Sequence, residues 1–178
     1  MSKVYMVSDT HFGHAKIITL CSRPYKNIEA MNKDLILRWN NTVAKDDIVF
    51  HLGDFGFGDK RRIAEIVRAL NGRIVLCLGN HDGHGIKWHY DVGFYNVYKY
   101  PIVYAREYLL SHAPFFPLED FNDGKTPFIN IFGHIHNRTT IPTFGPSHAC
   151  ISIENIDYRP MTFEEIANNI KNAKAKSS

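Results

Sequence analysis

The sequence lacks several features that assign chains to common classes. No apolar run approaches the roughly 20 residues that span a bilayer, and the first residues show no charged-then-apolar leader. The three cysteines, at positions 21, 77 and 150, form neither an even set nor a closely spaced pair. This argues against a disulfide framework and favours free thiols in a reducing compartment. We therefore expect a cytoplasmic protein without membrane association.

Strong charge and internal repetition are also missing. The 178 residues carry a formal net charge of +3, a mildly basic balance that suits an anionic substrate. It falls short of a nucleic-acid-binding footprint, so no stable nucleic-acid complex is expected. No repeat, low-complexity tract or linker interrupts the chain. A chain of this length buries roughly 70% of its unfolded surface when it folds. We therefore predict a single domain over residues 1–178. The oligomeric state is open.

Apolar periodicity predicts alternating strands and helices in the first half of the chain. The expected elements, in order, are a strand at Val4–Val7, a helix over Asn27–Val43, a strand at Ile48–Leu52, a helix over Lys60–Leu70 and a strand at Ile74–Leu78.

The second half changes to short β-rich segments. Strands are expected at Phe94–Tyr98, Ile102–Tyr104, Tyr108–Leu110, Phe128–Phe132 and Cys150–Ile153, and the close spacing of the first three predicts hairpins. A capping box, Thr162 with Glu165, opens a last helix from Phe163 to about Ala173. This order predicts an α/β fold in which two sheets pack face to face with helices outside.

Histidine is abundant, with ten in the chain, and five of them lie in short polar blocks that follow apolar runs. The blocks are Asp9-Thr10-His11, Gly53-Asp54, Gly79-Asn80-His81-Asp82, Ser111-His112 and Gly133-His134-Ile135-His136. Ligand sites in open α/β folds form at the carboxyl ends of strands. Acids, imidazoles and a carboxamide there are suited to two transition-metal ions, and the lone carboxylate of Asp54 suits a bridge between ions about 3.5–4 Å apart.

In this order the blocks resemble the calcineurin-like metallophosphoesterase superfamily, whose motifs are D-x-H, G-D, G-N-H-[D/E], H and G-H-x-H. The resemblance covers about residues 3–137, with the motifs inside 9–136. The predicted single domain continues beyond it with a C-terminal strand and helix over 150–174. The resemblance implies a four-layer α/β/β/α sandwich of two mixed β-sheets flanked by helices. It also implies ligand sets: one metal ion bound by Asp9, His11, Asp54 and His136, and the other by Asp54, Asn80, His112 and His134.

The resemblance further implies that His81 is not a ligand but the general acid that protonates the leaving group. The reaction implied is phosphoester hydrolysis by metal-activated water. Mixed nitrogen and oxygen ligands favour manganese, iron, zinc or nickel over an all-oxygen magnesium or calcium site. Among these, the resemblance most often implies manganese.

One departure from the family pattern concerns substrate choice. Many family phosphatases carry an acid three residues after the bridging Asp, which orients the catalytic histidine, and then a phosphate-binding arginine. Here Phe57 and Gly58 stand at those positions, so Asp82 and Asp59 are the two candidates to orient His81. Without the arginine we predict a phosphodiesterase for small nucleotide-type substrates. Nearby phenylalanines either offer a stacking surface for a base or belong to the core: Phe55, Phe57, Phe115 and Phe116.

Three alternatives stay open: a phosphomonoesterase, a nuclease acting on short nucleic acid, and a non-catalytic interaction module of the same fold. The presence of His81 and of a full ligand set argues against the module. With no cap domain, specificity is expected from loops Ile18–Lys26, Phe55–Lys60, Gly83–Tyr90 and Phe115–Phe121. Of the remaining histidines, His51 is expected in the core or behind the ligands, and three are candidates to line the pocket: His14, His84 and His89.

Overall fold

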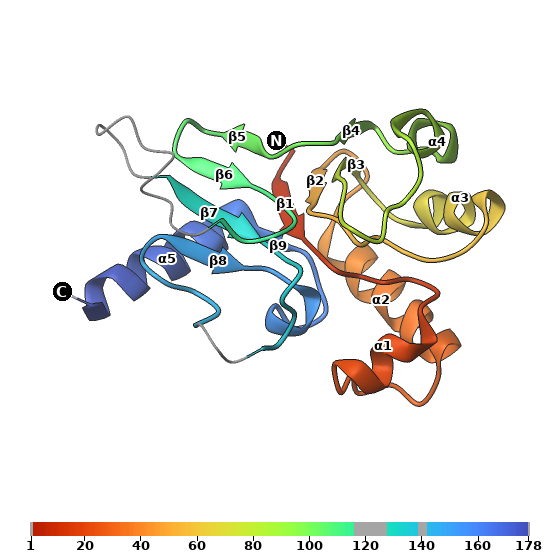
Figure 1. Cartoon of the computed structure of the whole chain (residues 1–178), viewed down its shortest axis with the longest axis horizontal. Coiled ribbons are helices and arrows are strands. Elements are labelled where there is room, and N and C mark those ends of the chain that lie inside the picture. The colour runs from red at the N-terminus through yellow and green to blue at the C-terminus, as the bar shows by residue number, and fades with distance from the viewer. Residues whose placement is uncertain (1, 116–127, 139–141, 178) are drawn as a thin grey trace.

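Two β-sheets lie side by side at the centre of the computed structural model, which describes residues 2–115, 128–138 and 142–177 (Figure 1). Within these residues the first sheet has the strand order β4-β3-β2-β1-β9 and the second the order β5-β6-β7-β8. The strands of the first sheet are β1 (Val4–Val7), β2 (Ile48–His51), β3 (Arg73–Cys77), β4 (Asn96–Tyr98) and β9 (Met161–Thr162). Those of the second are β5 (Ile102–Tyr104), β6 (Tyr108–Leu110), β7 (Ile129–Phe132) and β8 (His148–Cys150).

Helices flank the sheets. They are α1 (Ala15–Leu20), α2 (Ile28–Thr42), α3 (Lys60–Ala69), α4 (Ile86–Val92) and α5 (Phe163–Ser177), with a 3₁₀ turn, η2, at Ile153–Asn155. Figure 1 shows α1 to α4 on the side of the first sheet and α5 beside the second. Each sheet contains both parallel and antiparallel pairs. The predicted α/β sandwich of two mixed sheets flanked by helices is thus confirmed.

Local sequence explains where the long helices begin and which face they bury. The Asn27 side chain accepts a hydrogen bond from the Ala30 N–H, which caps α2. The buried residues of this helix are Met31, Leu35 and Trp39, a four-residue spacing that forms one helical stripe. Burial of each such side chain contributes about 1.5–3 kcal/mol. The helix therefore covers the first sheet with a single apolar face.

The two sheets are joined where β1 and β8 end. The N–H of Ser8 donates to the Ile151 carbonyl at 3.1 Å, and the N–H of Ile153 donates to the Ser8 carbonyl at 3.0 Å. Because β1, β2 and β3 pair in parallel, and β6, β7 and β8 do as well, carboxyl ends from both sheets meet at this junction. This edge is where the polar blocks follow the strands.

The predicted hairpins are only partly correct. β5 and β6 pair antiparallel, but β4 pairs in parallel with β3 in the other sheet. The intervening helix α4 supplies the crossover that a parallel pair needs. This helix, bounded by Gly85 and Gly93, is too short for the spacing of its apolar residues to predict it. The last strand of the second sheet also lies earlier than Cys150–Ile153, since the chain already turns into η2 at Ile153.

The capping box of Thr162 and Glu165 is present, with the Glu165 N–H donating to the threonine hydroxyl and the Thr162 N–H donating to the Glu165 carboxylate. The three cysteines are buried and unpaired. In the described part of the chain, no helix is long and apolar enough to cross a membrane.

Candidate metal centre

Asp9 follows β1 and presents one carboxylate oxygen to a cluster of imidazoles. Its Oδ2 accepts hydrogen bonds from the Ser152 hydroxyl at 2.9 Å and from the His134 N–H at 2.8 Å. Its Oδ1 is buried without a hydrogen-bond partner among the described residues. A buried acceptor with no donor is costly unless a cation satisfies it. Asp9 is therefore fixed through one oxygen and free to bind through the other.

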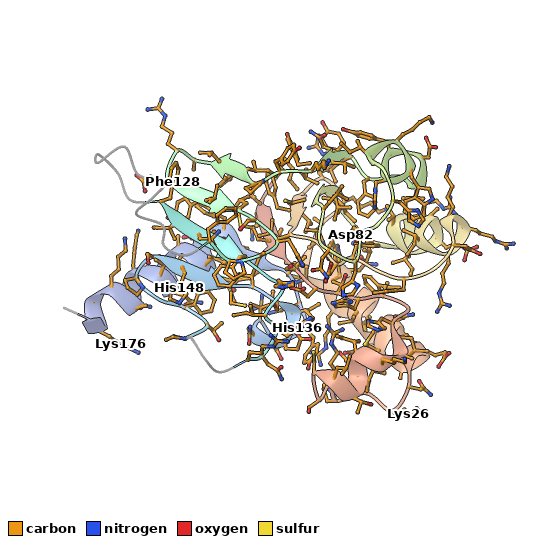
Figure 2. The ribbon with its side chains drawn as sticks, viewed as in Figure 1. Lys26, Asp82, Phe128, His136, His148 and Lys176 are labelled. Atoms are coloured by element: carbon orange, nitrogen blue, oxygen red, sulfur yellow. The ribbon has the colours of Figure 1, made fainter. Side chains whose placement is uncertain are left out.

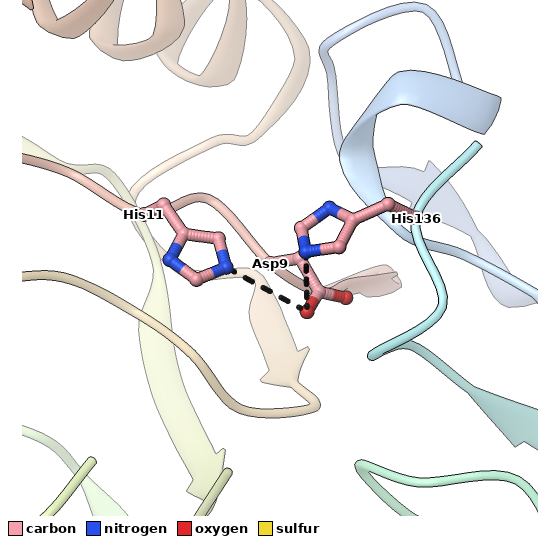
Figure 3. Close-up of side chains that lie close together, drawn as sticks. All are labelled: Asp9, His11 and His136. Atoms are coloured by element: carbon pink, nitrogen blue, oxygen red, sulfur yellow. Dashed lines mark ion pairs between the residues drawn. The ribbon is translucent and has the colours of Figure 1, made fainter. Parts of the chain in front are cut away.

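A first group of ligand atoms surrounds this oxygen. Oδ1 of Asp9 lies 4.0 Å from Nε2 of His11 and 3.9 Å from Nε2 of His136, as Figure 3 shows. The ligand atoms of these three residues all lie within 4.8 Å of one another. Nε2 of His11 is also buried and lacks a partner in the described chain. One carboxylate oxygen and two imidazole nitrogens form a donor set for a transition metal.

A second group is formed by Asp54, His112 and His134, whose ligand atoms also lie within 4.8 Å of one another. Nδ1 of His112 donates to the Leu52 carbonyl at 2.8 Å, so Nε2 points into the group. It lies 2.8 Å from Oδ1 of Asn80 and 3.2 Å from Nδ1 of His134. Imidazole nitrogens and side-chain oxygens that converge in this way form a donor set for a transition metal.

Asp54 borders both groups. Its Oδ2 lies 3.5 Å from Nε2 of His11 and 3.5 Å from Nε2 of His112, and its Oδ1 accepts the N–H of His81 at 2.8 Å. One carboxylate in contact with both groups is what a bridging ligand requires. The structure therefore brings together every residue that the sequence predicts as a ligand: Asp9, His11, Asp54, Asn80, His112, His134 and His136.

The backbone at these positions is held in an unusual conformation. Left-handed φ angles occur at Asp9 (60°), His11 (50°), Asp54 (56°), His134 (70°) and His136 (52°). This region is sparsely populated by residues other than glycine, and such strain, of order 1–3 kcal/mol each, concentrates at functional sites. Sharp turns directly after the strands are the local reason that these side chains converge.

Gly133 shows how closely the loops approach at the centre. A Cβ placed on it would overlap with side-chain atoms of Ser8 and Asp9. Only glycine lets the loop after β7 lie against the loop after β1. The glycine before His134 therefore brings the second sheet into contact with the first.

Two residues that the sequence motifs do not include support the first group. Nδ1 of His136 donates to Glu154 Oε1 at 3.0 Å, and the buried Arg23 donates to the same oxygen at 2.7 Å. Arg23 also donates to the Asp9 carbonyl at 2.7 Å. Burial lowers the pKa of His136, but the Cys21 thiol and the Glu154 and Asp9 carboxylates outweigh it and raise that pKa to about 10. This network fixes the ring so that Nε2 faces the cluster.

The geometry agrees with what comparison of the whole chain shows. The family model of the calcineurin-like phosphoesterases matches residues 2–176. The chain belongs to this family. It is a metal-dependent phosphoester hydrolase, and the resemblance drawn from the order of the motifs is confirmed. Family membership and the two groups of ligand atoms together support a dinuclear metal centre.

Relatives of this phosphoesterase span archaea, phages and bacteria. An uncharacterized protein of Methanocaldococcus jannaschii is 38% identical over 180 residues, covering 98% of this chain and 94% of that protein. The gene 66 protein of Mycobacterium phage L5 is 29% identical over 164 residues, covering 77% and 79%. A crystal structure of a protein of unknown function from Aquifex aeolicus has a TM-score of 0.70 and 26% identity, covering 94% of this chain and 99% of that one.

In this phosphoesterase, His81 lies beside the ligand groups with an exposed side chain. Its ring centroid is 5.6 Å from that of His11, 6.4 Å from that of His14 and 5.3 Å from that of Phe57. His81 is thus within reach of a substrate bound at the centre, as a proton donor must be.

Neither acid considered for orienting His81 contacts its ring. The Asp82 carboxylate instead accepts three backbone N–H groups, from Gly79, Asp54 and Phe55, at 2.8, 2.8 and 3.1 Å. Asp59 accepts the Arg62 N–H and caps α3. Both acids therefore hold backbone in place, and the aromatic ring of Phe57 flanks the histidine.

His81 lines two cavities. The first, about 350 Å³, is lined by members of both ligand groups and by His14, Leu20, Cys21 and Arg138. The second, about 270 Å³, is lined by Phe57, Gly58, His84, Trp88 and other residues. Three of the predicted specificity loops thus contribute walls, while residues 116–121 of the fourth, Phe116 included, lie outside the described residues. Figure 2 labels Asp82, which lines the second cavity, and His136, which lines the first.

The other aromatic and imidazole side chains divide between core and cavity. His51 is fully buried, accompanied by Trp39 and Phe55, and its pKa is lowered to about 3 by burial. It is a core residue, as expected. Phe55 is 2% exposed and also belongs to the core, although its edge reaches the second cavity. Phe115 is half-buried and its N–H donates to Asn130.

Proposed function

We propose that this phosphoesterase hydrolyses phosphodiesters, with small nucleotide-type compounds as its substrates, and that its two metal ions are manganese. The observation that carries the two-metal assignment is the position of Asp54, whose Oδ2 lies 3.5 Å from an imidazole nitrogen of each group. Iron, zinc and nickel are the alternatives that the same donor set accommodates.

The proposed ligand sets follow the two groups. One ion takes Asp9, His11, Asp54 and His136, and the other takes Asp54, Asn80, His112 and His134. The unpartnered buried atoms of Asp9 and His11 support the first set. The convergence of Nε2 of His112 and Oδ1 of Asn80, 2.8 Å apart, supports the second. When bound, such ions lower the pKa of water and neutralise charge on the phosphoryl oxygens.

The protein's own part in the reaction is positioning and proton transfer. His81 is the catalytic acid: its imidazole gives a proton to the departing oxygen. The backbone N–H of His81 donates to Asp54, which holds the residue beside the ligand groups without making its ring a ligand. The Asp82 carboxylate keeps this loop against the loop after β2. No covalent enzyme intermediate is required.

Charge around the first cavity supports a diester rather than a monoester. A monoester dianion carries one more negative charge than a diester, and family phosphatases meet it with an arginine that Gly58 replaces here. Among the described residues that line this cavity, Arg138 is the single arginine and no lysine is present. A single exposed guanidinium suits a monoanionic phosphodiester.

We also propose that residues 1–178 form one metallophosphoesterase domain. The buried apolar residues make one cluster that includes side chains of both sheets and of α2, α3 and α5. Across the sheets, the rings of Phe50 in β2 and Tyr104 in β5 lie 5.4 Å apart. A site built at the junction of the sheets needs them to fold as one unit.

The test compares kcat/KM for bis-p-nitrophenyl phosphate and p-nitrophenyl phosphate at one pH and one Mn²⁺ concentration. We expect the diester to be preferred, and the same assay with iron, zinc or nickel ranks the metals. A preference for the monoester would identify a phosphomonoesterase. Cleavage of oligonucleotides in preference to dinucleotides would identify a nuclease. Either result overturns the proposed substrate class.

A further inference from the structure

The second cavity has walls unlike those of the metal centre. It holds about 270 Å³ and adjoins the first cavity at His81, which lines both. Its lining includes the buried carboxylate of Asp82, already saturated by backbone N–H groups, and no lysine or arginine among the described residues. The cavity therefore does not suit a phosphate, and an uncharged group fits it better.

The wall formed by α4 and the loop before it is aromatic. The rings of His84 and Trp88 stack with centroids 4.1 Å apart and an interplanar angle of 17°. His89 meets Trp88 edge-on at 5.0 Å, and its Nδ1 donates to the Gly85 carbonyl at 3.1 Å. The indole is thus held in place and already accepts a planar ring at stacking distance.

Phe57 stands between this cavity and the ligand groups. Its ring lies 5.3 Å from His81 and 5.8 Å from His11. A substrate whose phosphorus lies at the metal centre must therefore extend past His81 and Phe57 to reach Trp88. The part of the substrate that passes His81 is the part that receives its proton, namely the leaving alcohol.

We propose that this cavity binds a planar aromatic group, such as a nucleobase, carried by the alcohol that leaves phosphorus. The proposal rests on the proposed phosphodiesterase function and adds the orientation of the bound substrate, in which the uncharged nucleoside half lies against Phe57 and Trp88. An oxygen of water bonds to phosphorus and one of the water protons is released to solvent. The bond from phosphorus to the alcohol oxygen breaks, and its electron pair stays on that oxygen, which takes the proton of His81. The volume lies just below the roughly 300–1,000 Å³ of pockets for drug-sized ligands, so one nucleoside is the upper limit.

Binding of an uncharged nucleoside tests the cavity without any turnover. Trp88 is one of two tryptophans, and the other, Trp39, is 1% exposed in the core. We expect adenosine, but not ribose, to quench the fluorescence of the protein with or without Mn²⁺. In Trp88→Leu the quenching disappears and the affinity measured by calorimetry falls about 5- to 100-fold, the range for loss of one stacked base. Trp88→Phe, which keeps a ring, retains most of the affinity.

A matched control is Tyr100→Leu, an aromatic side chain that is 71% exposed and outside both cavities, which should bind adenosine as the wild type does. Phe57→Leu removes the opposite wall and should weaken binding independently of α4. Equal adenosine affinity in the wild type and in the Trp88→Leu and Phe57→Leu variants would overturn the proposal.

Kinetics separate this proposal from the proposed function. Trp88→Leu should lower kcat/KM about 5- to 100-fold for a dinucleoside monophosphate, and leave it unchanged for dimethyl phosphate, which has no aromatic group to occupy the cavity. Hydrolysis of both esters with an equal effect of Trp88→Leu on each refutes the cavity alone. Failure to hydrolyse any phosphodiester refutes the proposed function, whereas adenosine quenching through Trp88 still supports the cavity as a nucleoside site.

Discussion

Individual side chains in this centre are fixed through one atom and left free at another. Asp9 is held through Oδ2, Asp54 through Oδ1, and the rings of His112 and His136 through Nδ1. In each case the second atom faces the cluster. Preorganisation of this kind means that metal binding orders little that is not already ordered.

Replacing His81 by alanine separates the acid from the ligands. We expect kcat to fall by roughly 10²–10⁴, because the leaving oxygen loses its proton donor, while the metal content stays near normal. The loss should be smaller for p-nitrophenyl esters, whose leaving group needs no proton, than for alkyl esters. Metal analysis and kcat for both ester types check this, and a His81→Ala protein that loses one metal ion would show that His81 is a ligand.

Glu154→Gln tests the support behind His136. The amide cannot match the carboxylate that orients the ring and pairs with Arg23, so the affinity for Mn²⁺ should fall about 10- to 100-fold. Calorimetric titration of the purified variant measures this. Glu164→Gln, on the exposed side of α5, is the control and should bind as the wild type does. Unchanged affinity in Glu154→Gln would refute the role given to this network.

Metal binding should release protons. The pKa of His136 is raised to about 10, so its ring is protonated at neutral pH, and an ion that takes Nε2 must displace that proton. The affinity for Mn²⁺ should therefore rise with pH from 6 to 8, by about tenfold per unit if one proton is released. Titrations in buffers of different ionisation enthalpy count the released protons. A pH-independent affinity would contradict this reading of His136.

At the scale of elements, Asp82 joins the loop after β3 to the loop after β2. Asp82→Ala leaves three backbone N–H groups without their acceptor, and each unsatisfied buried group costs about 1–3 kcal/mol. We expect the free energy of unfolding to fall by at least that amount in urea titrations. The cap variant Asp59→Ala should lose only about 1 kcal/mol. Equal losses in the two variants would show that the Asp82 bonds are exposed and weak.

The elements also show where prediction from sequence succeeds. Ligands at strand ends can be predicted from the sequence, because an apolar run stops there at a glycine followed by an acid or a histidine, as at Gly53-Asp54. The pairing of β4 cannot be predicted from the local sequence, because it depends on contacts with strands that are distant in sequence. The role of Glu154 cannot be predicted from the sequence either. This residue lies beyond the last motif, and its contact with His136 forms only because the two sheets are joined.

The whole molecule places its chemistry where two sheets meet, so each ligand group draws on both. Asp9 and His11 follow β1 and His136 follows β7, while Asp54 follows β2 and His112 follows β6. Asp54 touches both groups, and its loss should damage both metal sites and abolish activity, as should excess EDTA. A substitution of this single carboxylate therefore tests whether the centre is dinuclear.

The most direct measurement is the ratio of bound manganese to protein after equilibrium dialysis, determined by elemental analysis for the wild type and for Asp54→Asn. The account predicts two ions per wild-type chain and a loss at both sites in the variant, because Oδ2 of Asp54 lies 3.5 Å from an imidazole nitrogen of each group. One ion per wild-type chain, or a variant that keeps two ions and full activity, would contradict it.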